Sequence, residues 1–130
     1  MNRKTLLKKI RAGAKRCVTY VPEWADEGEE PVKLFFTPQT PADEIEVQNM
    51  LTGLDMPAGS EATYSTVALL VQKLEDETGA KLFVPGDIND LMNQKSSLIA
   101  RIARQISSGE SFEEKVEKAK KPSEITATDS

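Results

Sequence analysis

The stretch SEATYSTVALLVQKLEDET, residues 60–78, carries the strongest helical pattern of the chain. Ser60 is a candidate N-cap, and Gly79 suits the position that follows a helix. Because threonine and valine have low helix propensity, packing must hold this segment helical. The pattern therefore predicts the central helix of the core. Its apolar stripe, spaced by three or four residues, consists of Tyr64, Val67, Ala68, Leu70, Val71 and Leu74.

Two shorter helices are predicted after this stretch. A small apolar plug, residues 82–84, ends at Pro85-Gly86, and Asp87 is a candidate cap for the first helix. That helix places Ile88, Leu91 and Met92 on one face. The second helix is predicted in SSLIARIARQI, residues 96–106, and its apolar face consists of Leu98, Ile99, Ile102, Ala103 and Ile106.

A further helix is predicted upstream, in residues 39–54. Thr40 is a suitable N-cap and Pro41 suits the first helical position. Two acidic residues follow at the positive end of the helix dipole, and Gly53 is expected to end the helix. Its apolar stripe consists of Ile45, Val47, Met50, Leu51 and Leu54.

Residues 16–38 are predicted to form a β-hairpin. The two runs CVTYV and VKLFF are rich in β-branched and aromatic residues. The connection between them, PEWADEGEEP, is polar and longer than a tight turn. An isolated two-stranded ribbon is marginal in water, and neither face of this one is polar throughout. One face is therefore expected to pack on helices and the other to meet another subunit.

The charge of the chain is unevenly distributed. Residues 1–16 hold seven basic residues and no acidic one, whereas the remainder holds ten basic and twenty-one acidic residues. Leu6, Leu7 and Ile10 have helical spacing, which predicts a basic N-terminal helix in residues 1–13. A docked or frayed terminal helix is the favoured interpretation, and the sequence does not distinguish docking on the chain's own body from docking on a neighbour. Nucleic-acid binding is disfavoured, because aromatic residues are not interleaved and the acidic remainder would repel phosphates.

The chain turns polar after residue 109. Between residues 110 and 130 only Phe112 and Val116 offer much apolar burial, which cannot offset about 1–2 kcal/mol of backbone ordering per residue. We therefore expect a flexible polar C-terminal tail, residues 110–130, after a single small domain, residues 1–109. The predicted fold class is mainly α with a small β-hairpin (α+β) and four to six helices, with residues 40–108 as the helical core.

Composition and motifs argue against catalysis. The chain has no histidine, and it lacks a CxxC pair, a GxxxxGK[ST] loop and a GxSxG turn. Its single cysteine, Cys17, is expected to be buried and inert. The acidic run at residues 26–30 lacks the alternating spacing of a calcium loop and is interpreted as a solvated hairpin tip. We predict no enzyme activity, no cofactor, and no catalytic or metal-binding residue.

The sequence also restricts the compartment. No stretch approaches eighteen consecutive apolar residues, so a membrane-spanning helix is not expected. The N-terminus lacks the apolar segment of a secretory signal, and a single cysteine fits a reducing cytoplasm. A hydrophobic content of 38% and a charged content of 29% are typical of a soluble globular domain.

The order of the parts resembles that of the tail assembly chaperones of long-tailed (siphovirus-type) bacteriophages. An acidic turn in DETGAKLF leads to VPGDINDLMNQKSSLIARIARQI and then to FEEKVEKAKKPSE. The basic opening, the ribbon and the threonine-proline helix start fit the first half, so the resemblance covers most of residues 16–124. The long acidic hairpin loop departs from the short glycine turn of many family members.

The resemblance implies a non-enzymatic protein that binds the tape measure protein, keeps it soluble and recruits the major tail tube protein. It also implies action in the host bacterial cytoplasm and absence from the mature virion. Many members have a longer form made by a ribosomal frameshift, and the candidate junction here is Lys120-Lys121. A long client needs repeated weak contacts, which an open head-to-tail oligomer would multiply.

The sequence offers several apolar residues as candidate contacts with a partner or a second copy. They are Trp24, Phe35, Phe36, Leu98, Ile102 and Ile106. Two other functions stay open at this point. One is a structural tail completion or head–tail connector protein of the virion, and the other is a small nucleic-acid-binding regulator that uses residues 1–16.

Overall fold

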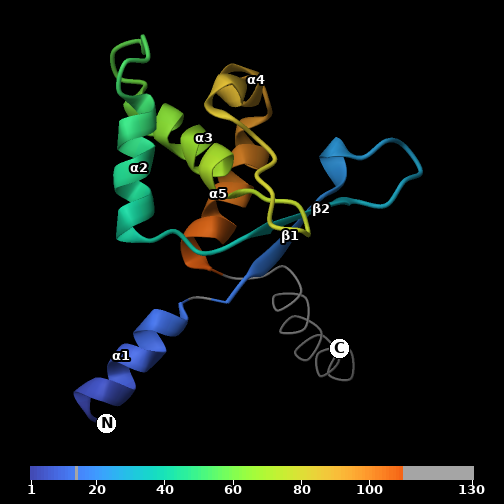
Figure 1. Ribbon diagram of the computed structural model, residues 1–130. Helices are drawn as coiled ribbons and strands as arrows, with labels where there is room; N and C mark the ends of the chain where they lie inside the picture. Colours follow the sequence, from blue (N-terminus) through green and yellow to red (C-terminus); the bar gives the residue numbers. More distant parts are fainter. Residues whose placement is uncertain (14, 110–130) are drawn as a thin grey trace, which may run out of the picture.

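The computed structural model describes residues 1–13 and 15–109 (Figure 1). The predicted tail, residues 110–130, and the candidate junction Lys120-Lys121 lie outside the described residues. Within them the chain forms five α-helices and one β-hairpin, which confirms the predicted fold class. The elements are α1 (Arg3–Ala12), β1 (Cys17–Val21), β2 (Val32–Phe36), α2 (Pro41–Leu51), α3 (Glu61–Lys73), α4 (Ile88–Met92) and α5 (Ser96–Ser108), with short 3-10 helices η1 (Pro22–Trp24) and η2 (Pro85–Asp87).

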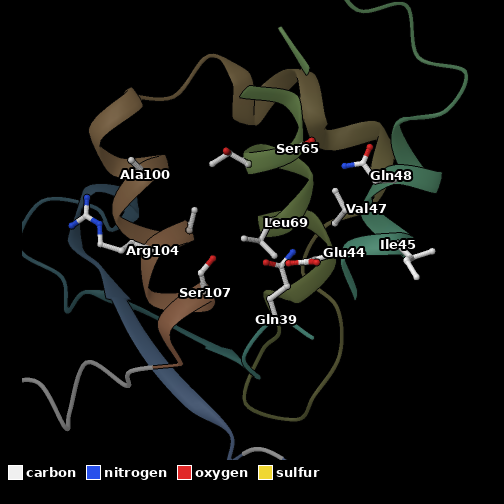
Figure 2. Close-up of a pocket in the computed structure, with 12 residues that line it drawn as sticks. Gln39, Glu44, Ile45, Val47, Gln48, Ser65, Leu69, Ala100, Arg104 and Ser107 are labelled. Carbon is white, nitrogen blue, oxygen red and sulfur yellow. The ribbon is translucent and has the colours of Figure 1, made fainter. Parts of the chain in front are cut away.

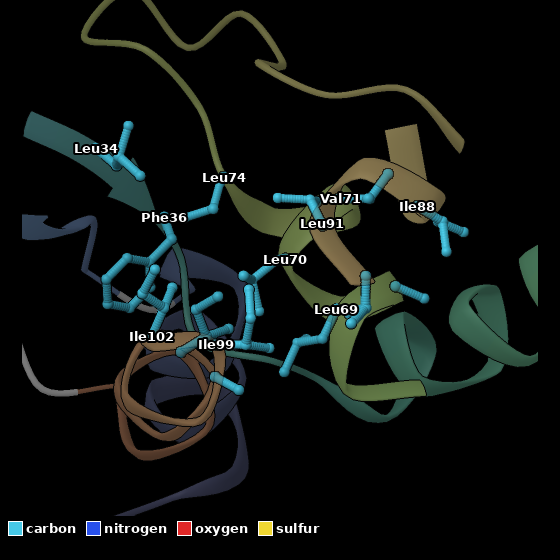
Figure 3. Close-up of a cluster of buried hydrophobic side chains, with 14 of the residues drawn as sticks. Leu34, Phe36, Leu69, Leu70, Val71, Leu74, Ile88, Leu91, Ile99 and Ile102 are labelled. Atoms are coloured by element: carbon cyan, nitrogen blue, oxygen red, sulfur yellow. The ribbon is translucent and has the colours of Figure 1, made fainter. Parts of the chain in front are cut away.

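Helix α3 is the centre of the core, as its pattern predicts. It packs against α2, α4 and α5, and residues 67–73 are all buried (Figure 3). The helix ends at Lys73, earlier than predicted, because Glu75 forms two backbone hydrogen bonds with Phe35 at the edge of the hairpin, of 2.8 and 2.9 Å. Ser60 does not cap the helix, since its hydroxyl donates to the Pro57 carbonyl instead.

Helix α5 lies beside α3 and buries its apolar stripe completely. The exposed fractions of Leu98, Ile102 and Ile106 are 4%, 0% and 0%. The prediction that these residues form a partner surface is therefore wrong, because α3 and the hairpin already cover them in the same chain. The same correction applies to Phe36, which is fully buried and lies close to Ile102 in Figure 3.

The hairpin is antiparallel, and its register pairs Cys17 with Phe36 and Val21 with Val32. Phe36 and Leu34 are buried against the helices, which confirms that one face packs on them. Cys17 is buried, as expected. The opposite face carries Tyr20, Lys33 and Phe35, and there the Arg16 guanidinium lies 4.4 Å from the centre of the Phe35 ring. This stacking covers part of Phe35 without making it core.

Helix α2 begins with the predicted cap. The Asp43 N–H donates to the Thr40 hydroxyl at 3.1 Å, and the Thr40 N–H donates to the Asp43 carboxylate at 3.0 Å. The predicted stripe is only half buried, because Val47 and Leu51 enter the core whereas Ile45 is 64% exposed. This outward isoleucine lies on the side of α2 that faces the groove described below.

The loop that leads to α4 is not the apolar plug that its sequence suggests. Leu82 is 40% exposed and Val84 is 61% exposed, whereas Phe83 packs on the edge of the core. Asp87 does not cap α4. Its carboxylate accepts the Val84 N–H at 2.8 Å and so caps η2.

Helix α1 forms as predicted, with Asn2 as its cap and Gly13 at its C-terminal end. Gly13 has a φ of 74°, which a glycine adopts without strain. None of the helix residues is buried, and the helix extends away from the other elements (Figure 1). Helix α1 is thus formed but not docked on its own chain within the described residues, because no other element there covers its apolar stripe. None of the helices in the described ranges has the length and apolarity needed to cross a bilayer.

Candidate partner-binding groove

A groove runs between α2 and α5 over the surface of α3 (Figure 2). It exists because both helices pack on α3 rather than closely on each other. Its volume is about 820 Å³. The residues that line it are Gln39, Glu44, Ile45, Val47, Gln48, Ser65, Thr66, Leu69, Ala100, Ala103, Arg104 and Ser107.

The surface of the groove is mostly apolar, and one wall is made of small side chains. Leu69 and Val47 lie at its base, while Ala100, Ala103 and Ser107 face it from α5. Small residues at this spacing allow the backbone of another helix to approach closely. The groove is thus suited to the helix-in-groove mode, in which an amphipathic helix inserts its apolar stripe.

The two rims carry opposite charges. Glu44 stands on the α2 side and Arg104 on the α5 side, and both side chains are exposed. A bound helix with basic residues along one flank and acidic residues along the other would match both rims. Rim charges of this kind select orientation and partner more than they add affinity.

A buried polar cluster holds the α2 wall against α3. The Lys73 ammonium donates to the Asp43 carboxylate at 2.8 Å and to the Thr37 hydroxyl at 2.9 Å, and its side chain is only 8% exposed. The Gln72 side chain donates to the Asp43 carbonyl at 2.9 Å and to the Glu46 carboxylate at 3.0 Å. Burial raises the pKa of Asp43, but hydrogen bonds from Lys73 and Thr40 outweigh it, so the pKa lies below its ordinary value.

This cluster makes stability fall in acid. Because the folded-state pKa of Asp43 is lowered from 3.8, its contribution is complete above pH 3.8 and is lost as the pH falls through the folded value. We expect the free energy of unfolding, measured by urea denaturation, to drop below about pH 4. An Asp43→Asn variant should show a shallower drop, and an unchanged slope would contradict the assignment.

A second exposed surface lies at the loop end of the hairpin. Trp24 packs edge-on against Phe83, with ring centres 6.1 Å apart, and its indole N–H donates to Gln94 at 3.0 Å. Leu82 and Val84 stand exposed beside Phe83 in the chain. We refer to Trp24, Leu82, Phe83 and Val84 as the aromatic patch.

An ion pair holds the start of this loop, at η1 directly after β1. Arg101 of α5 donates two hydrogen bonds to the Glu23 carboxylate, at 2.8 and 3.0 Å. The hydrogen bond from Arg101 lowers the pKa of Glu23 below its ordinary value. The turn that carries Trp24 is therefore tied to the core, so the indole is held in a defined position.

The structure does not gather the six predicted contact residues on one surface. Four of them, Phe36, Leu98, Ile102 and Ile106, belong to the core. Trp24 and Phe35 are half-buried and remain candidates.

Sequence reasoning missed the groove, although two signals for it were present. Ala100 and Ser107 mark a small-residue side of α5 that adjoins the apolar stripe at Ala103. Ile45 is displaced from the side of α2 on which Val47 and Leu51 are buried. No group of carboxylates or sulfur ligands in the described ranges is placed to hold a metal ion.

No protein-family model matches the chain, and no curated protein matches it in sequence. The structure is similar to that of the bacteriophage HK97 tail assembly chaperone, with a TM-score of 0.54 and 18% sequence identity. The match covers 82% of this chain and 95% of that chain. The fold implied by the sequence resemblance is therefore confirmed, and this chain shares the fold of a bacteriophage tail assembly chaperone.

Proposed function

We propose that this protein is a non-catalytic tail assembly chaperone that binds a helical segment of the tape measure protein in the groove between α2 and α5. The observation that carries the proposal is the groove itself: an open, mostly apolar channel with a small-residue wall, in a fold shared with the HK97 chaperone. The sequence resemblance points to the same role.

The groove suits a long client whose apolar stripe would otherwise aggregate. A client helix would cover Leu69 and Ala103 at the base and contact the exposed Ile45 at the rim. Burying apolar area provides the driving force, at roughly 25 cal/mol per Å². One groove binds only a few turns, so many copies along a client would be needed to keep it soluble.

In this role the protein acts in the host bacterial cytoplasm, recruits the major tail tube protein to the coated client, and is absent from the mature virion. Lys120-Lys121 remains the proposed junction of a longer, frameshifted form. A gene without a slippery codon run at these lysines would remove that part of the proposal.

The experiment is co-expression with the neighbouring tape measure protein, followed by pull-down and a solubility assay. We expect wild type to hold the client in solution. Ile45→Asp and Ala100→Glu, which place a charge in the groove, should each weaken capture about tenfold or more. Both sites are exposed, so the variants should fold as wild type does.

Leu54→Asp is the matched control, since Leu54 is also an exposed aliphatic side chain, 42% exposed against 64% for Ile45, but lies outside the groove. It should capture the client normally when the chaperone is in excess. A client that stays insoluble with wild type would refute the chaperone role. Recovery of the protein from purified particles would instead favour a structural component of the tail.

A further inference from the structure

Helix α1 is an unpartnered amphipathic helix. Its ten residues hold five basic side chains and no acidic one, and none of them is buried. Leu6 is 47% exposed and Ile10 is 62% exposed, on the same side of the helix. Apolar side chains at this spacing, flanked by Arg3 and Lys9, are typical of a helix that docks on an acidic, apolar surface.

The hairpin loop provides a surface of that chemistry. Four exposed carboxylates, Asp26, Glu27, Glu29 and Glu30, follow the aromatic patch residue Trp24 in the hairpin loop. Exposed Leu82 and Val84 provide apolar contact area next to Phe83, on which Trp24 packs. The Trp24 side of the patch is held in place by the indole hydrogen bond to Gln94 and by the Arg101–Glu23 pair, which limits the conformational entropy lost there on binding.

The two complementary surfaces cannot meet within one chain. Helix α1 and the loop between η1 and β2 lie at opposite ends of the molecule (Figure 1). The chain is anchored at Arg16, whose guanidinium donates to the Glu77 carbonyl at 2.9 Å and stacks on Phe35. Residues 13–16 then span at most about 14 Å, which is too short to carry α1 around the body.

We propose that α1 of one copy docks on the aromatic patch and acidic loop of a second copy. Leu6 and Ile10 would cover Leu82 and Val84, while Arg3 and Lys9, which flank that stripe on its two sides, would face the carboxylates of the loop. Because the donor and acceptor surfaces lie at opposite ends, each copy leaves one of each free, and the contact extends into an open chain.

This proposal adds a contact between copies to the proposed function, and it rests on that function only to explain what a chain of copies is for. It leaves the groove between α2 and α5 open in every copy. A row of copies would therefore present a row of grooves to one long client.

The test is sedimentation velocity of the full chain without client, over a wide concentration range and at low and high salt. We expect the mass of wild type to rise above 14.3 kDa with concentration, and less so at high salt. Arg3→Glu/Lys9→Glu should weaken association about tenfold or more, and Glu27→Lys/Glu29→Lys should do the same. All four sites are exposed, and circular dichroism checks that α1 still forms.

Mixing the two charge-reversed proteins provides the decisive control. The reversed α1 of one matches the reversed loop of the other, so the mixture should associate where neither protein does alone. A wild-type chain that stays monomeric, reversals without effect, or a mixture that fails to associate would each overturn the interface. A monomer that instead binds an oligonucleotide through α1 would also overturn it.

The outcome is separable from that of the client assay. Self-association that follows these charges without client capture would refute only the chaperone role. Client capture by a strictly monomeric chain would refute only this interface.

Discussion

Replacing Phe36 with alanine is expected to lower the free energy of unfolding by about 3–5 kcal/mol. The Phe36 side chain is fully buried at the junction of β2 and α5, in the same cluster as Ile102 and Leu74 (Figure 3). Its removal leaves a cavity in this cluster that the surrounding elements cannot fill by moving together. Small domains have only about 5–15 kcal/mol of total stability, so a large part of it is at stake. Urea denaturation followed by circular dichroism measures the change.

Phe35→Ala is the matched control, since it removes the same side chain from the neighbouring position on the outer face of the ribbon. Phe35 is half-buried and its ring is covered by Arg16, so we expect a loss of only about 1 kcal/mol. Equal losses at the two positions would contradict the strand register that places Phe36 opposite Cys17.

Replacing Lys73 with alanine is expected to cost about 3 kcal/mol, the second largest effect. The change leaves the Asp43 carboxylate, whose side chain is 19% exposed, without its buried ammonium partner. It also frees the Thr37 hydroxyl and loosens the α2 wall of the groove. Urea denaturation at neutral pH measures the loss, and client capture should weaken with it.

Lys73→Met separates packing from charge, because methionine retains most of the apolar stem. We expect it to remain strongly destabilised, and a double-mutant cycle with Asp43→Asn should show a coupling of about 1 kcal/mol or more. A Lys73→Met protein as stable as wild type, with additive effects at Asp43, would show that the pair does not hold α2.

The periodic segments could be predicted because local pattern and tertiary burial agree in them. The stripe of α5 and the N-cap at Thr40 follow directly from residue type and spacing. The end of α3 could not be predicted, since a long-range backbone pairing between Glu75 and Phe35 competes with helix continuation. The charged residue Lys73 is buried for a reason of the same kind, because its partner lies thirty positions away at Asp43.

The candidate contact residues were the weakest part of the prediction. Apolar side chains at helical spacing mark a buried face, but they do not show whether the same chain or a partner covers it. The stripe at Leu98 and Ile102 is covered by α3 and the hairpin, whereas the stripe at Leu6 and Ile10 is not covered at all. The groove arises from where α2 and α5 cross α3, a tertiary relation with no single sequence motif.

Methyl NMR of the chain, titrated with helical segments of the tape measure protein, tests the central claim most directly. We expect shifts at Ile45, Val47 and Leu69 in the groove, while Val84 in the aromatic patch stays unchanged. Shifts confined to Leu82 and Val84, or no shift with any segment, would contradict the assignment of the groove as the client site.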